Sequence, residues 1–336
     1  MSLSYDNEKF KILSKGHENE KEKGKRCYFC YLLRLEACAR FAKDNNIEYF
    51  ATTLSVSPLK SAQTLNKIGK DLEEIWGVKY LVSDFKKKDG FKRSIEISNI
   101  YGMYRQDYCG CVYSFCDRVM RSKGFIFDMD GTLLESMQFY EHFLSDYLKR
   151  YDIKAKPDLR EKIRALSVTQ AVLLAKKEYD IPKSDEEVVS EVKEIIFEFY
   201  ANDVTLKDGV LQFLKISHDM GIKMAVASAT DTEVCKMALK KLGVLEYFDF
   251  VKSTKDFNTS KKEPLIYDKC CELLDLNKNE VAVFEDAYHA IKTCKEAGYL
   301  TVSLKDASMQ KFEDEIISIS DIYIDNMMDL INRENI

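Results

Sequence analysis

Short apolar runs and longer amphipathic stretches alternate along most of the chain. Residues 125–127 (Phe-Ile-Phe) are three consecutive bulky apolar residues, followed at once by acidic residues and glycine. A continuous apolar run of this kind predicts a strand of a parallel sheet that is buried on both faces. Further strands are predicted at 222–227, 281–284, 300–304 and 322–324.

The intervals between these runs carry apolar residues at helical spacing. Between the first strand and the second they predict four consecutive helices, at 137–151, 159–166, 169–179 and 185–200. So many helices between one strand and the next look like a lid rather than part of the sheet. Strand and helix alternate again afterwards, which predicts an α/β core with an inserted helical segment at about 137–203.

The first third of the chain repeats this pattern on a smaller scale. Helical spacing at 27–42 and 61–76, with apolar runs at 49–54 and 80–82, predicts a partial α/β domain. Basic residues and phenylalanines then interleave over 84–93, DFKKKDGFKR. Aromatic residues among lysines suit nucleic-acid phosphates and bases, although by itself this signal is weak.

Length and charge both divide the chain in two. A chain of 336 residues is long enough for two domains, each with its own core. Residues 1–123 carry 23 Lys and Arg against 16 Asp and Glu (net +7), and the remainder carries 28 against 40 (net −12). We therefore expect domains at 1–122 and 123–336. The basic first domain suggests a polyanion partner, and a solvated basic surface explains the charge equally well.

No targeting or membrane signal is visible in the sequence. No run of 18 uncharged apolar residues exists, and the first ten residues, MSLSYDNEKF, lack an apolar signal core. We therefore expect a cytoplasmic protein with no membrane segment. The ten cysteines of such a protein argue against a structural disulfide framework.

Two carboxylates, Asp128 and Asp130, follow the strand at 125–127 directly. Open α/β sheets bind ligands at the carboxyl ends of their strands. Like charges this close need a positive partner, and Mg²⁺ with oxygen ligands is the usual one. The sequence therefore predicts a metal-assisted phosphate or carboxylate site, where Gly131 allows a tight turn and Thr132 offers a hydroxyl.

The Asp-x-Asp-Gly-Thr segment after an apolar strand resembles motif I of the haloacid dehalogenase superfamily, and motifs II and III follow in order. Ser228, followed by Ala229, ends the predicted strand at 222–227 in the place of motif II. A hydroxyl and free amides at such a turn suit a phosphate. In Ser-Lys-Lys-Glu-Pro-Leu-Ile-Tyr, Lys261 takes the place of the motif III lysine, with Lys262 as the neighbouring alternative.

Motif IV of the same superfamily is a strand that ends in carboxylates. Val-Ala-Val-Phe-Glu-Asp at 281–286 matches it, with Glu285 and Asp286 as the acidic pair. The resemblance implies a Rossmann-like core with a parallel sheet. It also implies that the inserted helices are the cap of the β-phosphoglucomutase-like subgroup.

The resemblance implies a role for each of these residues. Asp128 would attack phosphorus and form an aspartyl-phosphate, while Asp130 would protonate the leaving oxygen and then activate water. Mg²⁺ would be bound by Asp128, the backbone carbonyl of Asp130, Asp286 and, directly or through water, Glu285. The implied activity is a phosphatase for a small phosphomonoester. A phosphomutase with the same cap is the alternative.

Residues 5–114 resemble another family. GKRCYFCYLLRLEACA, FATTLSVSPLKS, SDFKKKDGFKRSIEIS and YGMYRQDYCGCVYS closely resemble epoxyqueuosine reductases of the QueH type, which complete the queuosine base in tRNA. The family implies that Cys27 and Cys30 are two ligands of a 4Fe–4S cluster, and that Cys109 and Cys111 are a redox-active pair.

This segment departs from its family in one respect. The family opens with a Cys-Cys pair that supplies the other two cluster ligands, and no cysteine precedes Cys27 here. A four-iron cluster needs about four protein ligands. We therefore expect the segment by itself to lack the family's cluster and its reductase activity. A third function remains open, in which the chain is an iron–sulfur tRNA-modifying reductase with an accessory hydrolase domain.

Overall fold

The computed structural model describes residues 7–20, 22–103, 109–159, 162 and 168–332. It divides into two compact units, one built on Met1–Ser114 and the other on Phe115–Ile331. None of the helices in these described ranges is long and apolar enough to cross a membrane.

The larger unit is organised around a parallel sheet of six strands in the order β5-β4-β3-β6-β7-β8. Ile126 lies in register between Ala225 and Val283, so β3 occupies the middle of the sheet. The strands are β3 (Gly124–Phe127), β4 (Lys223–Ser228), β5 (Phe250–Ser253), β6 (Val281–Glu285), β7 (Leu300–Leu304) and β8 (Ile322–Ile324). The predicted α/β fold with a parallel sheet is confirmed.

Helices cover both faces of this sheet, which is why β3 is apolar at every position. On one face Ile126 packs in a cluster with residues of helix α12 such as Ile266. On the other face the Phe125 ring stacks on Phe213 of helix α10, with 5.8 Å between centroids. The helices outside the inserted segment are α10 (Val210–Asp219), α11 (Thr232–Lys241), α12 (Leu265–Leu274), α13 (Tyr288–Glu296), α14 (Glu313–Ile319) and α15 (Asp329–Asn332).

Short 3-10 helices connect several of these elements. They are η2 (Leu245–Tyr247), η3 (Thr254–Phe257), η4 (Lys278–Glu280) and η5 (Ala307–Phe312). The sequence predicts one helix over 310–317, whereas the chain forms η5 and then α14. The edge strand β5 is absent from the predicted elements.

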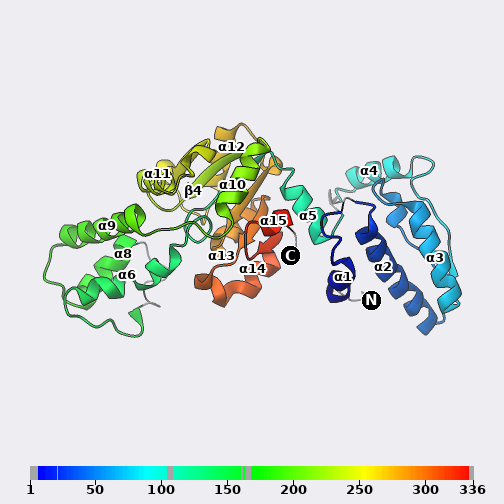
Figure 1. Ribbon diagram of the computed structural model, residues 1–336, viewed down its shortest axis with the longest axis horizontal. Coiled ribbons are helices and arrows are strands. Elements are labelled where there is room, and N and C mark those ends of the chain that lie inside the picture. The colour runs from blue at the N-terminus through cyan, green and yellow to red at the C-terminus, as the bar shows by residue number, and fades with distance from the viewer. Residues whose placement is uncertain (1–6, 21, 104–108, 160–161, 163–167, 333–336) are drawn as a thin grey trace. The chain divides into compact units, whose positions relative to one another are not determined.

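The segment inserted between β3 and β4 is helical and has its own core. It contains α6 (Met137–Lys149), α8 (Val168–Glu178) and α9 (Asp185–Asn202), which lie together in Figure 1. Apolar residues of the three helices, among them Leu144, Val172 and Val188, form one buried cluster. The helix predicted at 159–166 falls almost entirely outside the described residues. We call this segment the cap.

Two antiparallel segments join the cap to the sheet. Leu134 pairs with Leu206, and the Glu135 amide donates to the Thr205 carbonyl at 3.0 Å. Because Leu134 follows β3 by only seven residues, this paired connection begins in the same loop that carries Asp128 and Asp130.

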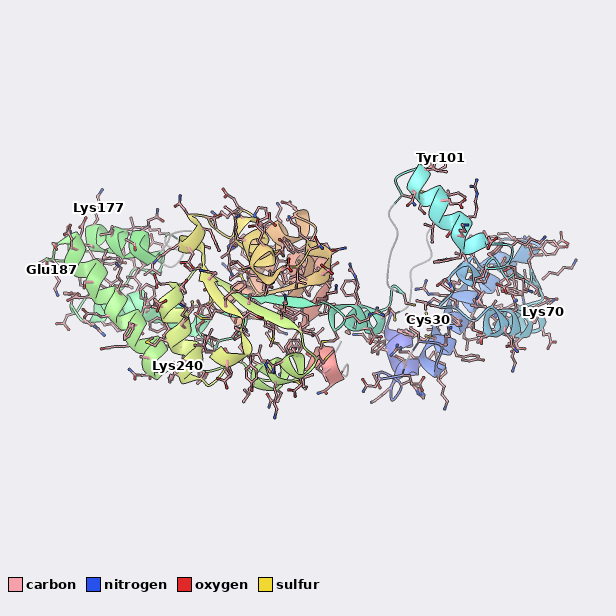
Figure 2. The ribbon with its side chains drawn as sticks, turned by 90° about the horizontal axis from the view of Figure 1, so that it is seen from above. Cys30, Lys70, Tyr101, Lys177, Glu187 and Lys240 are labelled. Atoms are coloured by element: carbon pink, nitrogen blue, oxygen red, sulfur yellow. The ribbon has the colours of Figure 1, made fainter. Side chains whose placement is uncertain are left out.

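The smaller unit contains a two-stranded parallel sheet packed against helices. Its elements are α1 (Asn7–Ser14), α2 (Lys25–Asp44), β1 (Tyr49–Phe50), η1 (Leu54–Val56), α3 (Ala62–Trp76), β2 (Lys79–Tyr80) and α4 (Gly90–Ile100), and α5 (Val112–Val119) runs across the boundary between the units. Cys30 on α2 and Lys70 on α3 mark the two helices that pack together in Figure 2. A Cβ at Gly69 would come within 2.5 Å of the Tyr80 ring, so α3 approaches β2 closely.

Two predicted elements of this unit differ from the structure. The strand predicted at 49–54 ends at Phe50, and the chain then turns into η1. The basic run at 84–93 is in part helical, since α4 begins at Gly90. Within the run Lys86 donates to the Lys60 carbonyl at 2.5 Å, and Arg93 pairs with Glu96 at 3.0 Å.

Candidate active site and thiol pair

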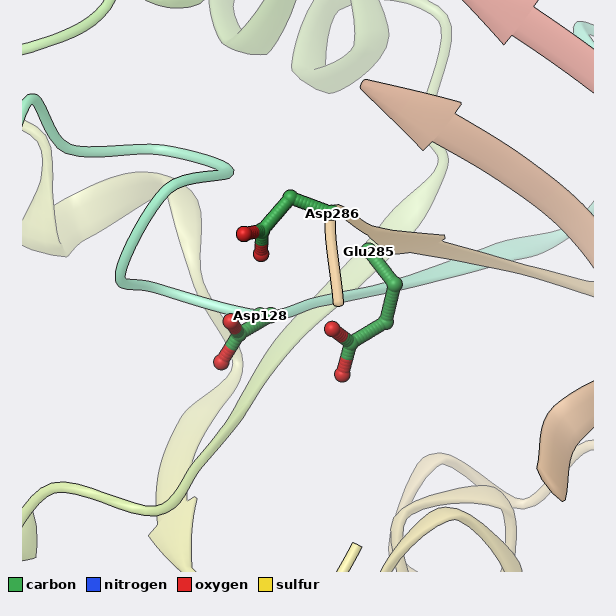
Figure 3. A group of neighbouring side chains, drawn as sticks. All are labelled: Asp128, Glu285 and Asp286. Carbon is green, nitrogen blue, oxygen red and sulfur yellow. The ribbon is translucent and has the colours of Figure 1, made fainter. Parts of the chain in front are cut away.

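Three buried carboxylates, those of Asp128, Glu285 and Asp286, gather where β3 and β6 end (Figure 3). One oxygen from each lies within 4.8 Å of the others. The two strand ends are fixed to each other, because the Asp128 amide donates to the Phe284 carbonyl at 2.9 Å. Asp128 of motif I and the two carboxylates of motif IV therefore meet at one point, whereas the Asp130 carboxylate is not one of this trio.

Lys261 is the cation among these carboxylates. Its ammonium group contacts Asp128 and lies 2.5 Å from Glu285 Oε1, and it is itself buried. Burial alone would lower the pKa of Lys261, but the charges of Asp128 and Glu285 raise it above its ordinary value. The Tyr267 hydroxyl of α12 donates to the same Glu285 oxygen at 2.7 Å. One ammonium thus faces three carboxylates, which leaves negative charge to be neutralised.

The carboxylates fit a hard divalent cation such as Mg²⁺. Glu285 Oε2 is buried and has no hydrogen-bond partner among the described residues. Burial, together with the charges of Asp128 and Glu285, raises the pKa of Asp286 well above its ordinary value. Buried oxygens of this kind are costly without a cation, and carboxylate oxygens are ligands that Mg²⁺ prefers.

The turn after β3 passes directly against Asp286. Gly131 has φ +81°, and a Cβ at this position would lie 2.5 Å from Asp286 Oδ2. The Thr132 hydroxyl, one residue later, donates to Asp286 Oδ1 at 3.2 Å. Glycine is therefore required here by both the backbone conformation and the contact.

Asp130 is held by hydroxyl groups rather than by a cation. Its Oδ1 accepts from Ser136 at 2.7 Å and from Tyr200, and its Oδ2 accepts from Thr230 at 2.8 Å. Loss of surrounding water and the charge of Asp128 raise the pKa of Asp130, while these hydrogen bonds oppose the rise. Asp128, for the same reason of burial and because Glu285 is close, has its pKa raised to about 6.

Ser228 and Ala229 lie at the end of β4, the strand beside β3. The Ser228 hydroxyl is buried and accepts from the Thr230 amide at 3.0 Å. Ala229 is exposed at the turn that follows. The structure thus brings the predicted phosphate-binding residues to the strand end next to Asp128, with Thr230 as the link to Asp130.

Several residues of this site have no motif that predicts them. Tyr200 and Tyr140 come from the cap. Lys207, just after the cap, donates to the Gly131 carbonyl at 2.7 Å and pairs with Asp306 at 2.8 Å. Sequence spacing carries no signal for these contacts, because each depends on how the cap and loops meet the sheet.

A cavity of about 820 Å³ lies between the cap and the turn after β4. Tyr140 and Phe197 line it from the cap, and Ala229 and Thr230 line it from the sheet. Charges of both signs border it, from Lys193, Glu194 and Lys255. Its size suits a small ligand.

The smaller unit holds the four predicted cysteines. Lys60, itself buried, donates to Cys109 Sγ, and the Ser114 amide donates to Cys111 Sγ at 3.4 Å. A hydrogen bond from Cys111 and the Lys60 ammonium lower the pKa of Cys109 to about 5. The same bond, and burial, raise the pKa of Cys111.

Cys27 and Cys30 lie on the first turns of α2. Cys27 is buried and accepts from the Lys23 amide at 3.3 Å, and Cys30 is half-buried. Among the described residues of this unit, no three ligand atoms of Cys, His, Asp or Glu lie within 4.8 Å of one another. That spacing describes a site for a single ion. Cys27 and Cys30 are two of the roughly four thiols that a four-iron cluster needs, so the expectation about the cluster stays a prediction.

Comparison with known proteins identifies the larger unit. Residues 125–304, more than half of the chain, match the family model described as haloacid dehalogenase-like hydrolase. The chain belongs to the haloacid dehalogenase-like hydrolases. The resemblance drawn from the four motifs is confirmed, and the chain is an enzyme of this family.

Solved structures of haloacid dehalogenase-like proteins share the fold. CbbY from Rhodobacter sphaeroides in complex with phosphate is 18% identical, with a TM-score of 0.53 over 62% of this chain and 96% of that one. A predicted phosphoglycolate phosphatase from Haemophilus somnus is 20% identical, with a TM-score of 0.52 over 63% and 98%. At these identities the likeness concerns the fold alone.

Residues 1–117 match the family model of epoxyqueuosine reductase QueH, which confirms the second resemblance. Epoxyqueuosine reductase QueH of Staphylococcus epidermidis is 45% identical over 116 residues, 34% of this chain and 49% of that protein. The Thermotoga maritima enzyme is 38% identical over 104 residues, 31% of this chain and 54% of that protein. The chain thus spans about half the length of the curated relatives it matches.

Proposed function

We propose that residues 123–336 are a Mg²⁺-dependent phosphatase that hydrolyses a small phosphomonoester through an aspartyl-phosphate on Asp128. The observation that supports this most directly is the buried trio Asp128, Glu285 and Asp286, of which Asp128 and Glu285 contact the buried ammonium group of Lys261. Together with a family of hydrolases whose fold it shares, this arrangement favours attack by a carboxylate on phosphorus.

Asp128 is the nucleophile in this proposal. Its pKa of about 6 leaves it ionised at neutral pH, and its contact with Lys261 fixes its orientation. A carboxylate oxygen bonds to phosphorus as the bond from phosphorus to the leaving oxygen breaks. Mg²⁺ bound by Asp128, Asp286, Glu285 and the backbone carbonyl of Asp130 would neutralise charge on the phosphoryl oxygens.

Asp130 is the acid and then the base. It gives a proton to the leaving oxygen, and afterwards it takes a proton from the water that hydrolyses the aspartyl-phosphate. Its raised pKa suits a group that must carry a proton for part of the cycle. Lys261, Ser228 and the Ala229 amide would hold the transferring phosphoryl group.

The cavity beneath the cap accommodates the rest of the substrate. A volume of about 820 Å³ limits the leaving group to a small molecule. Lys193 and Glu194 of α9 and Lys255 of η3 provide polar partners of both charges, so we propose a hydroxylated or zwitterionic leaving group.

A panel of phosphomonoesters with Mg²⁺ tests this function. The expected result is release of inorganic phosphate by the wild type and none by Asp128→Asn. If no ester in the panel loses phosphate with Mg²⁺ present, the proposed phosphatase is wrong. If phosphate moves within the substrate only after a bisphosphate is added, and none is released, the enzyme is a phosphomutase.

For residues 1–122 we propose thiol redox chemistry at Cys109 and Cys111. The contact between Lys60 and Cys109 supports it, because an adjacent cation favours the reactive thiolate. Closing the Cys109 thiolate and the Cys111 thiol to a disulfide would pass two electrons and the proton of Cys111 to an electron-accepting substrate, which we propose is an epoxide; a second proton would come from solvent. Two cysteines one residue apart form a small strained ring, so the disulfide would be easy to reduce. Binding of tRNA through the basic run stays a prediction.

A further inference from the structure

We propose that Tyr200 and Tyr140, two tyrosines of the cap, are positioning residues for Asp130. In this role they make protonation of the leaving group depend on contact between the cap and the sheet. The inference rests on the proposed phosphatase function and concerns the same site.

The contacts form a chain of hydroxyl groups that ends on Asp130. Tyr200, fully buried near the carboxyl end of α9, donates to Asp130 Oδ1. The Tyr140 hydroxyl on α6 lies 2.9 Å from the Tyr200 hydroxyl. Two cap helices that are about 60 residues apart in sequence thus converge on one carboxylate of the sheet.

The other donors to Asp130 come from different places. Ser136 belongs to the connection that leads into the cap, and Thr230 belongs to the turn after β4. Among the described groups of this hydroxyl network, the two tyrosines are the ones that lie on helices within the cap. Any displacement of the cap from the sheet would break their bond to Asp130, whereas Thr230 would keep its own.

Tyr140 also reaches the cavity where the leaving group would lie. It lines this cavity together with Thr230, the residue that donates to Asp130 Oδ2. A ligand in this cavity would therefore contact the same hydroxyl network that orients Asp130. Without the tyrosines, Asp130 Oδ1 would keep only Ser136, and the carboxyl group would be free to turn away from the leaving oxygen.

The effect of a substitution on activity can be compared between esters with different leaving groups. This comparison distinguishes a loss of acid catalysis by Asp130 from general damage to the site. A leaving group that is stable as an anion needs no proton, whereas a basic leaving group does. p-Nitrophenyl phosphate and phenyl phosphate form a pair of nearly equal size in which the phenolate of the second is far more basic. The ratio of their kcat/KM values therefore reports how well Asp130 acts as an acid.

The experiment measures kcat/KM for both esters in wild type, Tyr200→Phe and Tyr140→Phe. Tyr147→Phe is the matched control, because Tyr147 is another buried cap tyrosine whose hydroxyl donates to Glu191 at 2.8 Å. We expect Tyr200→Phe to lose about tenfold more activity on phenyl phosphate than on p-nitrophenyl phosphate. Tyr140→Phe should change the ratio in the same direction by less, and Tyr147→Phe should leave it unchanged.

Each remaining outcome decides a different point. Equal loss on both esters, or no loss on either, overturns the positioning role. A change of the ratio in Tyr147→Phe as large as in Tyr200→Phe also overturns it. Circular dichroism shows whether Tyr200→Phe folds, and if it does not, the ratio for Tyr140→Phe decides. Absence of wild-type turnover on both esters overturns the inference, and the panel of phosphomonoesters described above decides separately whether the phosphatase itself stands.

Discussion

The ammonium group of Lys261 contacts the carboxylate of Asp128, and both side chains are buried. Since Lys261 also lies 2.5 Å from Glu285, it is the cation that the protein itself supplies to the carboxylate trio. The sequence alone leaves a choice between Lys261 and Lys262 for this role. The structure places Lys261 at the carboxylates, whereas Lys262 is exposed.

This relationship gives the first prediction. Lys261→Met should lower kcat by about 10²–10³-fold, because it removes a fixed charge that faces the phosphoryl group. Lys262→Met is the matched control and should keep the wild-type rate within about twofold, since surface substitutions have small effects. Phosphate release with Mg²⁺ measures both. Similar losses in the two variants would contradict the role given to Lys261.

The second prediction concerns Gly131. Alanine there must take φ +81°, and its Cβ would lie 2.5 Å from Asp286 Oδ2. Gly221→Ala is the control, because Gly221 has φ +73° but no atom within 4 Å of the added Cβ. Urea denaturation should show a loss of about 1 kcal/mol for Gly221→Ala and more for Gly131→Ala.

Gly131→Ala should also weaken Mg²⁺ binding by about tenfold or more, because it displaces Asp286. Isothermal titration of Mg²⁺ measures this, and Gly221→Ala should bind as the wild type does. Wild-type affinity in Gly131→Ala would mean that Asp286 is not a ligand.

The third prediction is the pH dependence of Cys109. Because its pKa is lowered to about 5, Cys109 should be a thiolate at pH 6 and react with iodoacetamide at a rate that changes little up to pH 8. Lys60→Met should move the rise in rate to higher pH. Peptide mass spectrometry after timed alkylation gives the rates.

Two other thiols act as internal controls in that experiment. Cys38 is exposed as a residue, and the partial loss of water around its sulfur raises its pKa, so its rate should rise only above pH 8. Cys111, with a raised pKa, should react more slowly than Cys109 throughout. Equal rates for Cys109 and Cys111 at pH 6 would contradict the asymmetry of the pair.

The fourth prediction concerns acid stability of the cap. A hydrogen bond and the charge of Lys183, with a bond from Tyr151, lower the pKa of Glu191 to about 2, below its ordinary value of 4.5. A lowered pKa stabilises the folded state above about pH 4.5, and this stability is lost as the pH falls toward 2. Glu191→Gln should therefore flatten the fall of the melting temperature between pH 5 and pH 3.

Glu186→Gln, on the same helix but exposed, should keep the wild-type slope in that experiment. Thermal denaturation followed by circular dichroism measures all three proteins. Parallel slopes for the wild type and Glu191→Gln would show that this carboxylate does not contribute to the acid stability of the cap.

The strands of the larger sheet were mostly predictable from the sequence because both faces of the sheet are covered. β3 is buried at every position, so its apolar run is uninterrupted. β5 was not predictable, because Phe250 and Lys252 of this edge strand are only half-buried and Lys252 interrupts the apolar pattern. Helix α4 was not predicted either, because the lysines before it interrupt the apolar pattern.

The residues of the candidate site also fall into those that the sequence predicts and those that it does not. Asp128, Asp286 and Lys261 were predictable, since each stands at a fixed place after a strand or before a helix. Tyr140 and Tyr200 were not, because their approach to Asp130 depends on how the cap folds over the sheet. The spacing of residues along the sequence therefore does not predict this contact between the cap tyrosines and Asp130.

Transfer of a phosphoryl group to Asp128 is the central claim, and trapping of that intermediate tests it most directly. The enzyme is mixed with Mg²⁺ and its best phosphomonoester, quenched in acid within milliseconds, and digested for peptide mass spectrometry. The account predicts a phosphoryl group on Asp128 in the wild type and none on the same peptide of Asp128→Asn. Turnover by Asp128→Asn at the wild-type rate, or a phosphoryl group on another residue, would contradict it.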